Sequence, residues 1–128
     1  MKEYKNFKSK EFDSPDLPGS GDNMKDEFME LLQKAREIAD TPFRITSGFR
    51  TEAYQLDLKR RGYKTAKNKS PHQEGYACDI ACTDSKTRYL IIGSLMLAGF
   101  NRFGIGASFI HVDNSPNYTP NRVWTYKY

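Results

Sequence analysis

The order in which helical and strand-like patterns follow one another is the feature that most constrains the fold of this chain. Apolar residues recur at helical spacing over 24–39, and they alternate with polar residues over 43–48. Both kinds of pattern return further along, without a strict alternation of strand, helix and strand. This mixture indicates the α+β class. We predict a small antiparallel sheet flanked by about three helices.

Local signals set the bounds of these elements. Helices are predicted over 24–39, 51–61 and about 85–98. Their expected N-terminal caps are Asp22 or Asn23, Thr51, and Thr83 or Asp84. Strands are predicted over 43–48, 76–82 and 109–113, with 123–126 as a last edge strand. The segment 62–71 is predicted to be a basic loop.

The length and the apolar content bound the organisation of the chain. Its 128 residues suit one domain, 1–128, and an aromatic content of 13% argues against disorder. No apolar run approaches the roughly 20 residues that span a bilayer. No apolar stretch follows the N-terminal charges, as a secretory signal would require. We therefore expect no membrane partner, a monomer, and synthesis in the cytoplasm without a signal peptide.

Positive charge is concentrated in one stretch of the chain. The net charge is +4, and six basic residues fall close together: Lys59, Arg60, Arg61, Lys64, Lys67 and Lys69. A solvated loop explains this stretch, and so does contact with an acidic polymer. Only Tyr63 is interleaved with these residues, and no recognised binding module surrounds them, so no specific nucleic-acid partner is predicted.

The two cysteines are predicted to be separate thiols. Cys78 and Cys82 are four residues apart in an extended segment, so their Cα atoms should lie about 13 Å apart at roughly 3.3 Å per residue. A disulfide requires about 4.4–6.8 Å between Cα atoms. Both thiols should lie on the strand face opposite Asp79 as small buried apolar groups, which fits a reducing compartment.

Two histidines and two aspartates form the candidate chemical site. His72 precedes Asp79 by seven residues, and His111 precedes Asp113 by two. In an extended strand, His111 and Asp113 point to the same face. Catalytic zinc commonly takes three protein ligands and one water, and His72, Asp79 and His111 could supply those ligands. The spacing alone leaves a second interpretation open, in which both histidines are ordinary surface or capping residues.

Three segments resemble motifs of one family. The segment 70–79, SPHQEGYACD, resembles the Ser-x-His-x-x-Gly-x-Ala-x-Asp motif of the M15 zinc peptidases. The segments SGFRT at 47–51 and FIHVD at 109–113 resemble the upstream Ser-Gly-Tyr/Phe-Arg-Thr segment and the closing His-x-Asp segment of that family. The motifs occur in the family's order, and the resemblance covers about residues 7 to 113. The family comprises D-alanyl-D-alanine carboxypeptidases and peptidoglycan endopeptidases, related in fold to hedgehog signalling domains.

The resemblance implies roles for individual residues. It makes His72, Asp79 and His111 the ligands of a zinc ion carried by the sheet. It makes Arg50 the cation that steadies the substrate carbonyl or the oxyanion, which suits a fixed guanidinium near a metal. The alternative for Arg50 is a structural ion pair with a nearby acid. Ser70 is expected either to contact substrate or to shape its loop.

The sequence departs from the family pattern at two places. Many members have Glu or Asp as general base three residues before the last histidine, where this chain has Ser108. Asp113 is the best substitute, either as general base or as the partner that orients His111, and Glu74 is a weaker candidate for the base. The basic stretch 59–69 replaces a segment that is often neutral in the family, so its role in substrate preference stays open.

These observations favour a zinc metallopeptidase acting on peptidoglycan. It would be a D-alanyl-D-alanine carboxypeptidase or an endopeptidase that cuts a stem peptide or cross-link by a metal-activated water. The alternative is a catalytically weak or inactive zinc module that binds the cell wall. The expected place of action is the cell wall, and a small virus-encoded, phage-type lysis or entry enzyme (an endolysin) fits the resemblance.

Overall fold

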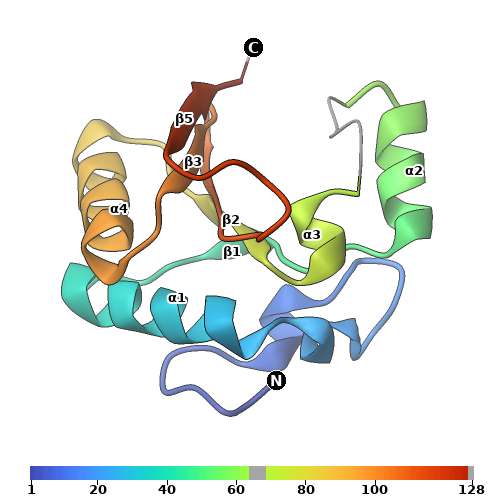
Figure 1. Ribbon diagram of the computed structural model, residues 1–128, viewed down its shortest axis with the longest axis horizontal. Helices are drawn as coiled ribbons and strands as arrows, with labels where there is room; N and C mark the ends of the chain where they lie inside the picture. Colours follow the sequence, from blue (N-terminus) through green and yellow to red (C-terminus); the bar gives the residue numbers. More distant parts are fainter. Residues whose placement is uncertain (64–68, 127–128) are drawn as a thin grey trace.

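The computed structural model describes residues 1–63 and 69–126 and confirms the α+β class. The strands are β1 (Ile45–Ser47), β2 (Ala77–Ala81), β3 (Arg102–Ile105), β4 (Phe109–Asp113) and β5 (Arg122–Thr125). The α-helices are α1 (Asp26–Ala39), α2 (Glu52–Arg60), α3 (Pro71–Glu74) and α4 (Ser85–Ala98). Two 3₁₀ helices, η1 (Ser9–Phe12) and η2 (Ser20–Asn23), precede α1. Figure 1 shows their arrangement.

In the described part of the chain, one mixed sheet has the strand order β1-β2-β4-β3-β5. The prediction of an antiparallel sheet was wrong in one pairing, because β5 runs parallel to β3. β4 already pairs with β2 on one side and β3 on the other. The chain that returns after β4 therefore cannot pair with β4, and it pairs with the free edge of β3. A strand that returns from β4 runs antiparallel to β4 and hence parallel to β3.

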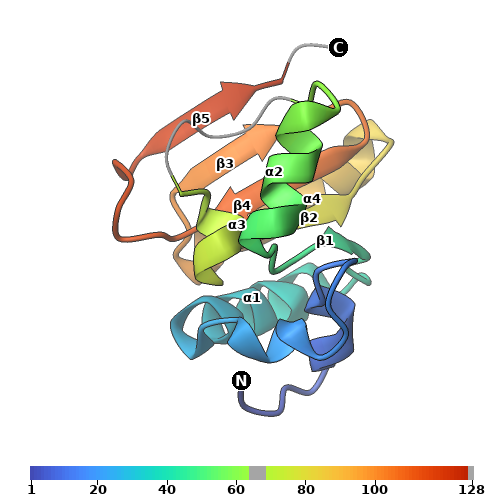
Figure 2. The same ribbon diagram turned by 90° about the vertical axis from the view of Figure 1, so that its right-hand side faces the viewer.

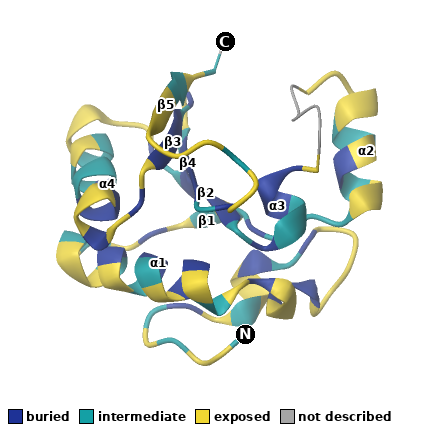
Figure 3. Ribbon diagram, in the orientation of Figure 1, coloured by how far each residue is buried: buried dark blue, intermediate teal, exposed yellow. Residues whose placement is uncertain are grey.

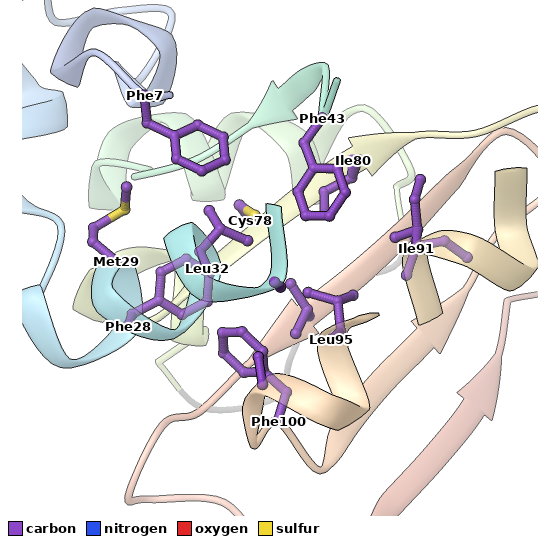
Figure 4. Packing of buried hydrophobic residues seen from close by; sticks show 14 of the residues in the cluster. Phe7, Phe28, Met29, Leu32, Phe43, Cys78, Ile80, Ile91, Leu95 and Phe100 are labelled. Carbon is purple, nitrogen blue, oxygen red and sulfur yellow. The ribbon is translucent and has the colours of Figure 1, made fainter. Parts of the chain in front are cut away.

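Helices α1 and α4 cover one face of the sheet (Figure 1). Cys78 and Ile80 point from β2 toward these helices and are fully buried against Leu32 of α1 and Leu95 of α4 (Figure 4). Both cysteines are free and buried, as predicted. This face is the apolar core, and the residues that alternate with it along β2 and β4 point to the opposite face.

Helices α2 and α3 lie on the other side of the sheet, in front of its strands in Figure 2. Figure 3 shows α2 largely exposed, whereas β2, β4 and much of α3 are buried. Lys59 and Arg60 fall in the exposed last turn of α2, and Lys64 and Lys67 of the basic stretch lie outside the described residues. In the part of the chain that the structure covers, no helix is both long and apolar enough to cross a membrane.

Two helix starts agree with the sequence and one does not. Thr51 Oγ1 accepts a hydrogen bond from Tyr54 N at 3.0 Å, and Asp84 Oδ1 accepts one from Thr87 N at 2.7 Å, as expected of N-caps. By contrast, α1 begins at Asp26 after Lys25. Asp22 and Asn23 do not cap it because they belong to η2.

Candidate metal centre

A row of residues across the sheet places the candidate site on the face opposite the core. Asp79 of β2 lies opposite His111 of β4, and His111 lies opposite Gly104 of β3. The row continues to Ser47 of β1 at one end and to Trp124 of β5 at the other. Residues directly opposite each other in a sheet point to the same face. The two predicted ligands from the sheet are therefore immediate neighbours.

The third predicted ligand, His72, comes from the one-turn helix α3, which precedes β2. Ser70 caps this helix, because its Oγ accepts a hydrogen bond from His72 N at 3.2 Å. Pro71 occupies the first turn, and Gly75 ends the helix with φ of +80°, a conformation that glycine adopts readily. Ser70 is 4% exposed. Its hydroxyl therefore shapes the turn that presents His72.

The three candidate ligand atoms form a small triangle. His72 Nε2 lies 3.2 Å from His111 Nδ1 and 3.4 Å from Asp79 Oδ1, and His111 Nδ1 lies 2.9 Å from Asp79 Oδ1. Zinc–ligand distances of about 2.0–2.1 Å give a tetrahedron with edges of about 3.3 Å. The triangle therefore matches one face of a zinc coordination tetrahedron, with its fourth corner available.

Each ligand side chain is held by a further contact. His72 Nδ1 donates to Gly48 O at 2.8 Å, so Nε2 is free to bind a cation. His111 Nε2 donates to Asp113 Oδ2 at 2.8 Å, so Nδ1 is the nitrogen that can bind a metal once it has lost its proton. Asp79 Oδ2 accepts from Arg50 Nη2 at 3.3 Å, leaving Oδ1 for a metal. Such contacts set tautomer and orientation in metal sites.

Arg50 is anchored beside the cluster by three contacts. Its Nε donates to Ser47 Oγ at 2.9 Å and its Nη1 to Gln55 Oε1 at 3.3 Å, in addition to the contact with Asp79. The side chain is 16% exposed. Arg50 thus forms the ion pair considered in the sequence analysis, and its partner is a candidate metal ligand.

Asp113 lies behind His111, on the side of the imidazole away from the triangle. It is fully buried, and its Oδ1 also accepts from Arg102 Nε at 2.7 Å. The Arg102 guanidinium lies over the rings of Tyr118 and Trp124, at 5.1 Å and 5.0 Å from their centroids. Arg102 was not predicted from the sequence, because the pairing of Arg102 with Asp113 depends on how β3 aligns with β4.

The other candidate bases lie in different surroundings. Ser108 is exposed in the turn between β3 and β4, where its carbonyl accepts from Cys82 N at 2.9 Å. The Glu74 carboxylate accepts from Ser115 Oγ at 2.6 Å and from Asn117 Nδ2. Glu74 thereby ties α3 to the segment after β4. In the described part of the chain, the candidate metal cluster consists of His72, Asp79 and His111 alone.

The pKa shifts in the metal-free chain indicate that His111 is protonated at neutral pH and that His72 is neutral. Burial lowers the pKa of His111, but hydrogen bonds to Asp113 and Asp79 and their negative charges raise it to about 9. Burial lowers the pKa of His72. Burial raises the pKa of Asp79, but the two histidines hold it well below its usual range. A divalent cation among the three ligand atoms would take the place of the proton of His111.

The aromatic side of the site, formed by Trp124, was not predicted from the sequence. The Trp124 ring lies 5.6 Å from the His111 ring between centroids. Gly104, between them in the row, has no side chain, and a Cβ there would lie 2.6 Å from Trp124 Nε1. A glycine inside a short strand signals a close approach of other groups, which is the one sequence signal available for this side.

The model of a family described as Peptidase M15 matches residues 5–113. This segment contains every candidate ligand and Arg50, and it ends before β5. The comparisons with curated proteins and with solved structures gave no match.

Proposed function

The chain belongs to the peptidase M15 family, and on that premise we propose that it is a zinc-dependent peptidase that hydrolyses a peptide bond in bacterial peptidoglycan. The observation that carries the proposal is the buried triangle of His72, Asp79 and His111. Its edges suit zinc, and each ligand is oriented by a further hydrogen bond.

The donor set favours zinc as the metal. Two imidazole nitrogens and one carboxylate oxygen form a three-ligand set typical of catalytic zinc sites, with one position left for water or substrate. When bound, zinc polarises the scissile carbonyl and lowers the pKa of water to near neutrality. The protein supplies the fixed geometry.

Arg50 has two tasks in this proposal. Its contact with Asp79 Oδ2 keeps the ligand oxygen Oδ1 turned toward the metal position. Its guanidinium, partly exposed at the rim of the cluster, stabilises negative charge that develops on the substrate carbonyl. We assign Ser70 to the turn that presents His72, since its buried hydroxyl is engaged in the cap.

Asp113 is assigned to holding His111. Its carboxylate binds His111 Nε2 and Arg102, both away from the ligand nitrogen Nδ1. A group on that side of the imidazole orients the ring and raises its basicity. It is poorly placed to take a proton from an attacking water, which must lie on the metal side.

One observation favours the second candidate function, a zinc module that binds the cell wall with little or no cleavage. Ser108 replaces the expected acid, and no further carboxylate joins the cluster among the residues that the structure describes. The net charge of +4 would assist approach to an anionic wall in either case. Action at the wall, the exact bond and a virus-encoded origin stay predictions from the sequence.

Purified sacculi provide the experiment that separates the two functions. The chain loaded with zinc should release muropeptide fragments, which mass spectrometry identifies, and a chelator should stop the release. The His72→Ala variant serves as the metal-binding control. Binding to sacculi without any new fragment would support the second function, and neither binding nor cleavage would reject both.

A further inference from the structure

Strand β5 brings an aromatic hydroxyl to the face of the sheet that carries the metal cluster. Trp124 of β5 lies opposite Gly104, which in turn lies opposite His111. Tyr126 follows two residues later, and its backbone N–H donates to Ile105 O at 3.1 Å. The extended backbone thus points Tyr126 to the same face as Trp124. Figure 2 shows β5 at the edge of the sheet, beyond β3.

The missing side chain at Gly104 gives Tyr126 room beside the cluster. A Cβ on Gly104 would lie 2.8 Å from Tyr126 Oη and 2.6 Å from Trp124 Nε1. The phenol oxygen therefore lies directly above Gly104. Residues opposite each other in neighbouring strands have Cα atoms about 4.5–5.5 Å apart. Tyr126 Oη accordingly lies on the same face of the sheet as His111, one strand away toward β5, whereas Arg50 is held at the β1 side.

The Tyr126 ring is held in place, but its hydroxyl proton is not donated to any described side chain or carbonyl. The ring packs against Phe109, with centroids 5.2 Å apart. The hydroxyls of Tyr4, Tyr76 and Tyr118 each donate to an acceptor. The Tyr126 side chain is partly buried, and its hydroxyl has no acceptor among the residues that the structure describes.

This hydroxyl stays protonated at neutral pH. Burial raises the pKa of Tyr126 to about 12, with the indole N–H of Trp124 acting in the opposite direction. The charges of Asp79 and Asp113 also raise this pKa and that of Arg50 lowers it, so the phenol is within electrostatic reach of the site. Tyr126 is therefore a fixed donor that lacks an acceptor.

We infer that Tyr126 is a further catalytic residue, whose hydroxyl donates a hydrogen bond to the scissile carbonyl oxygen as that oxygen becomes anionic. The inference rests on the proposed peptidase function. Arg50 would approach the same oxygen from the β1 side and Tyr126 from the β5 side. Tyr126 follows β5 and lies outside residues 5–113, so this donor is not part of the segment that the family model matches.

The test compares Tyr126→Phe with Tyr89→Phe, the same change at a side chain that is 78% exposed on α4. Both variants should keep the wild-type zinc content and Tm. Tyr126→Phe should lower kcat by about 10²–10³-fold with little change in KM, as expected on removal of one oxyanion donor. Tyr89→Phe should behave as wild type.

A binding measurement supplies a readout that does not depend on turnover. The probe is the phosphinate analogue of the bond identified in the muropeptide digest, because its tetrahedral anion resembles the transition state. Calorimetry should show that Tyr126→Phe weakens phosphinate binding by a factor similar to the kcat loss, whereas binding of the cleaved product is unchanged. Equal kcat and equal phosphinate affinity in the two variants would overturn the inference. Absence of cleavage by the wild-type chain would instead reject the peptidase function.

Discussion

The role of Asp113 can be tested by replacing its carboxylate with an amide of nearly the same shape. In the native chain, Asp113 Oδ2 accepts from His111 Nε2 at 2.8 Å and Oδ1 accepts from Arg102 Nε at 2.7 Å. Asp113→Asn removes the negative charge and replaces one acceptor with a donor. The amide can satisfy one of these two partners, and the other loses its acceptor.

Two effects of this change have predictable sizes. Loss of a contact that orients a metal-binding histidine weakens metal affinity by about 10–100-fold, or roughly 1.4–2.8 kcal/mol at about 1.4 kcal/mol per tenfold. Removal of one partner of a buried ion pair destabilises a protein by about 3–5 kcal/mol. We expect the lower end of that range, because Arg102 keeps its hydrogen bond to Thr119 O and its two aromatic neighbours.

Zinc affinity and kcat must be measured separately to distinguish orientation from proton transfer. Competition with a chelator gives the zinc Kd of Asp113→Asn, and muropeptide release at saturating zinc gives its kcat. If Asp113 orients His111, Kd rises and most of kcat returns when zinc is added. An unchanged Kd together with abolished kcat at saturating zinc would refute this reasoning and make Asp113 the general base. Unfolding monitored in parallel ensures that only folded protein is compared.

Three further predictions follow from the same geometry. The purified chain should bind about one zinc per molecule, and elemental analysis should find that His72→Ala, Asp79→Ala and His111→Ala each lose it; stoichiometric zinc in all three would contradict the assignment. Arg50→Ala should lower kcat by about 10²–10³-fold at saturating zinc, and unchanged turnover in the muropeptide assay would leave Arg50 with a structural role. Because the pKa of His111 is raised to about 9 in the metal-free chain, zinc must displace a proton below that pH. Zinc affinity measured by chelator competition should therefore rise about tenfold per pH unit up to about pH 9, and a flat profile would contradict the protonated state of His111.

Several features of this protein follow from short stretches of sequence. Side chains alternate between the two faces of a strand, so the predicted strand 76–82 points Cys78 and Asp79 to opposite faces. In the structure, Cys78 belongs to the apolar core and Asp79 belongs to the candidate metal cluster. Thr51 and Asp84 cap their helices as expected. These outcomes depend on hydrogen bonds and side-chain directions within a few residues, so the local sequence contains the information they require.

The neighbours of the candidate site could not be read from the sequence in this way. Arg102 reaches Asp113, and Gly104 lies between His111 and Trp124, because β3 aligns with β4 and β5 in one particular register. A shift by one residue would send each of these side chains to the other face. That register depends on contacts between segments far apart in the sequence, because the strands pair in the order β4-β3-β5 only in the folded chain. The sequence by itself therefore determined which residues can bind a metal and which faces of their strands they occupy. Only the tertiary structure decided which nitrogen of His111 faces the metal position and that Asp113 and Arg102 lie on the other side of the imidazole. It also decided that Tyr126, just after β5, lies over Gly104 on the same face of the sheet.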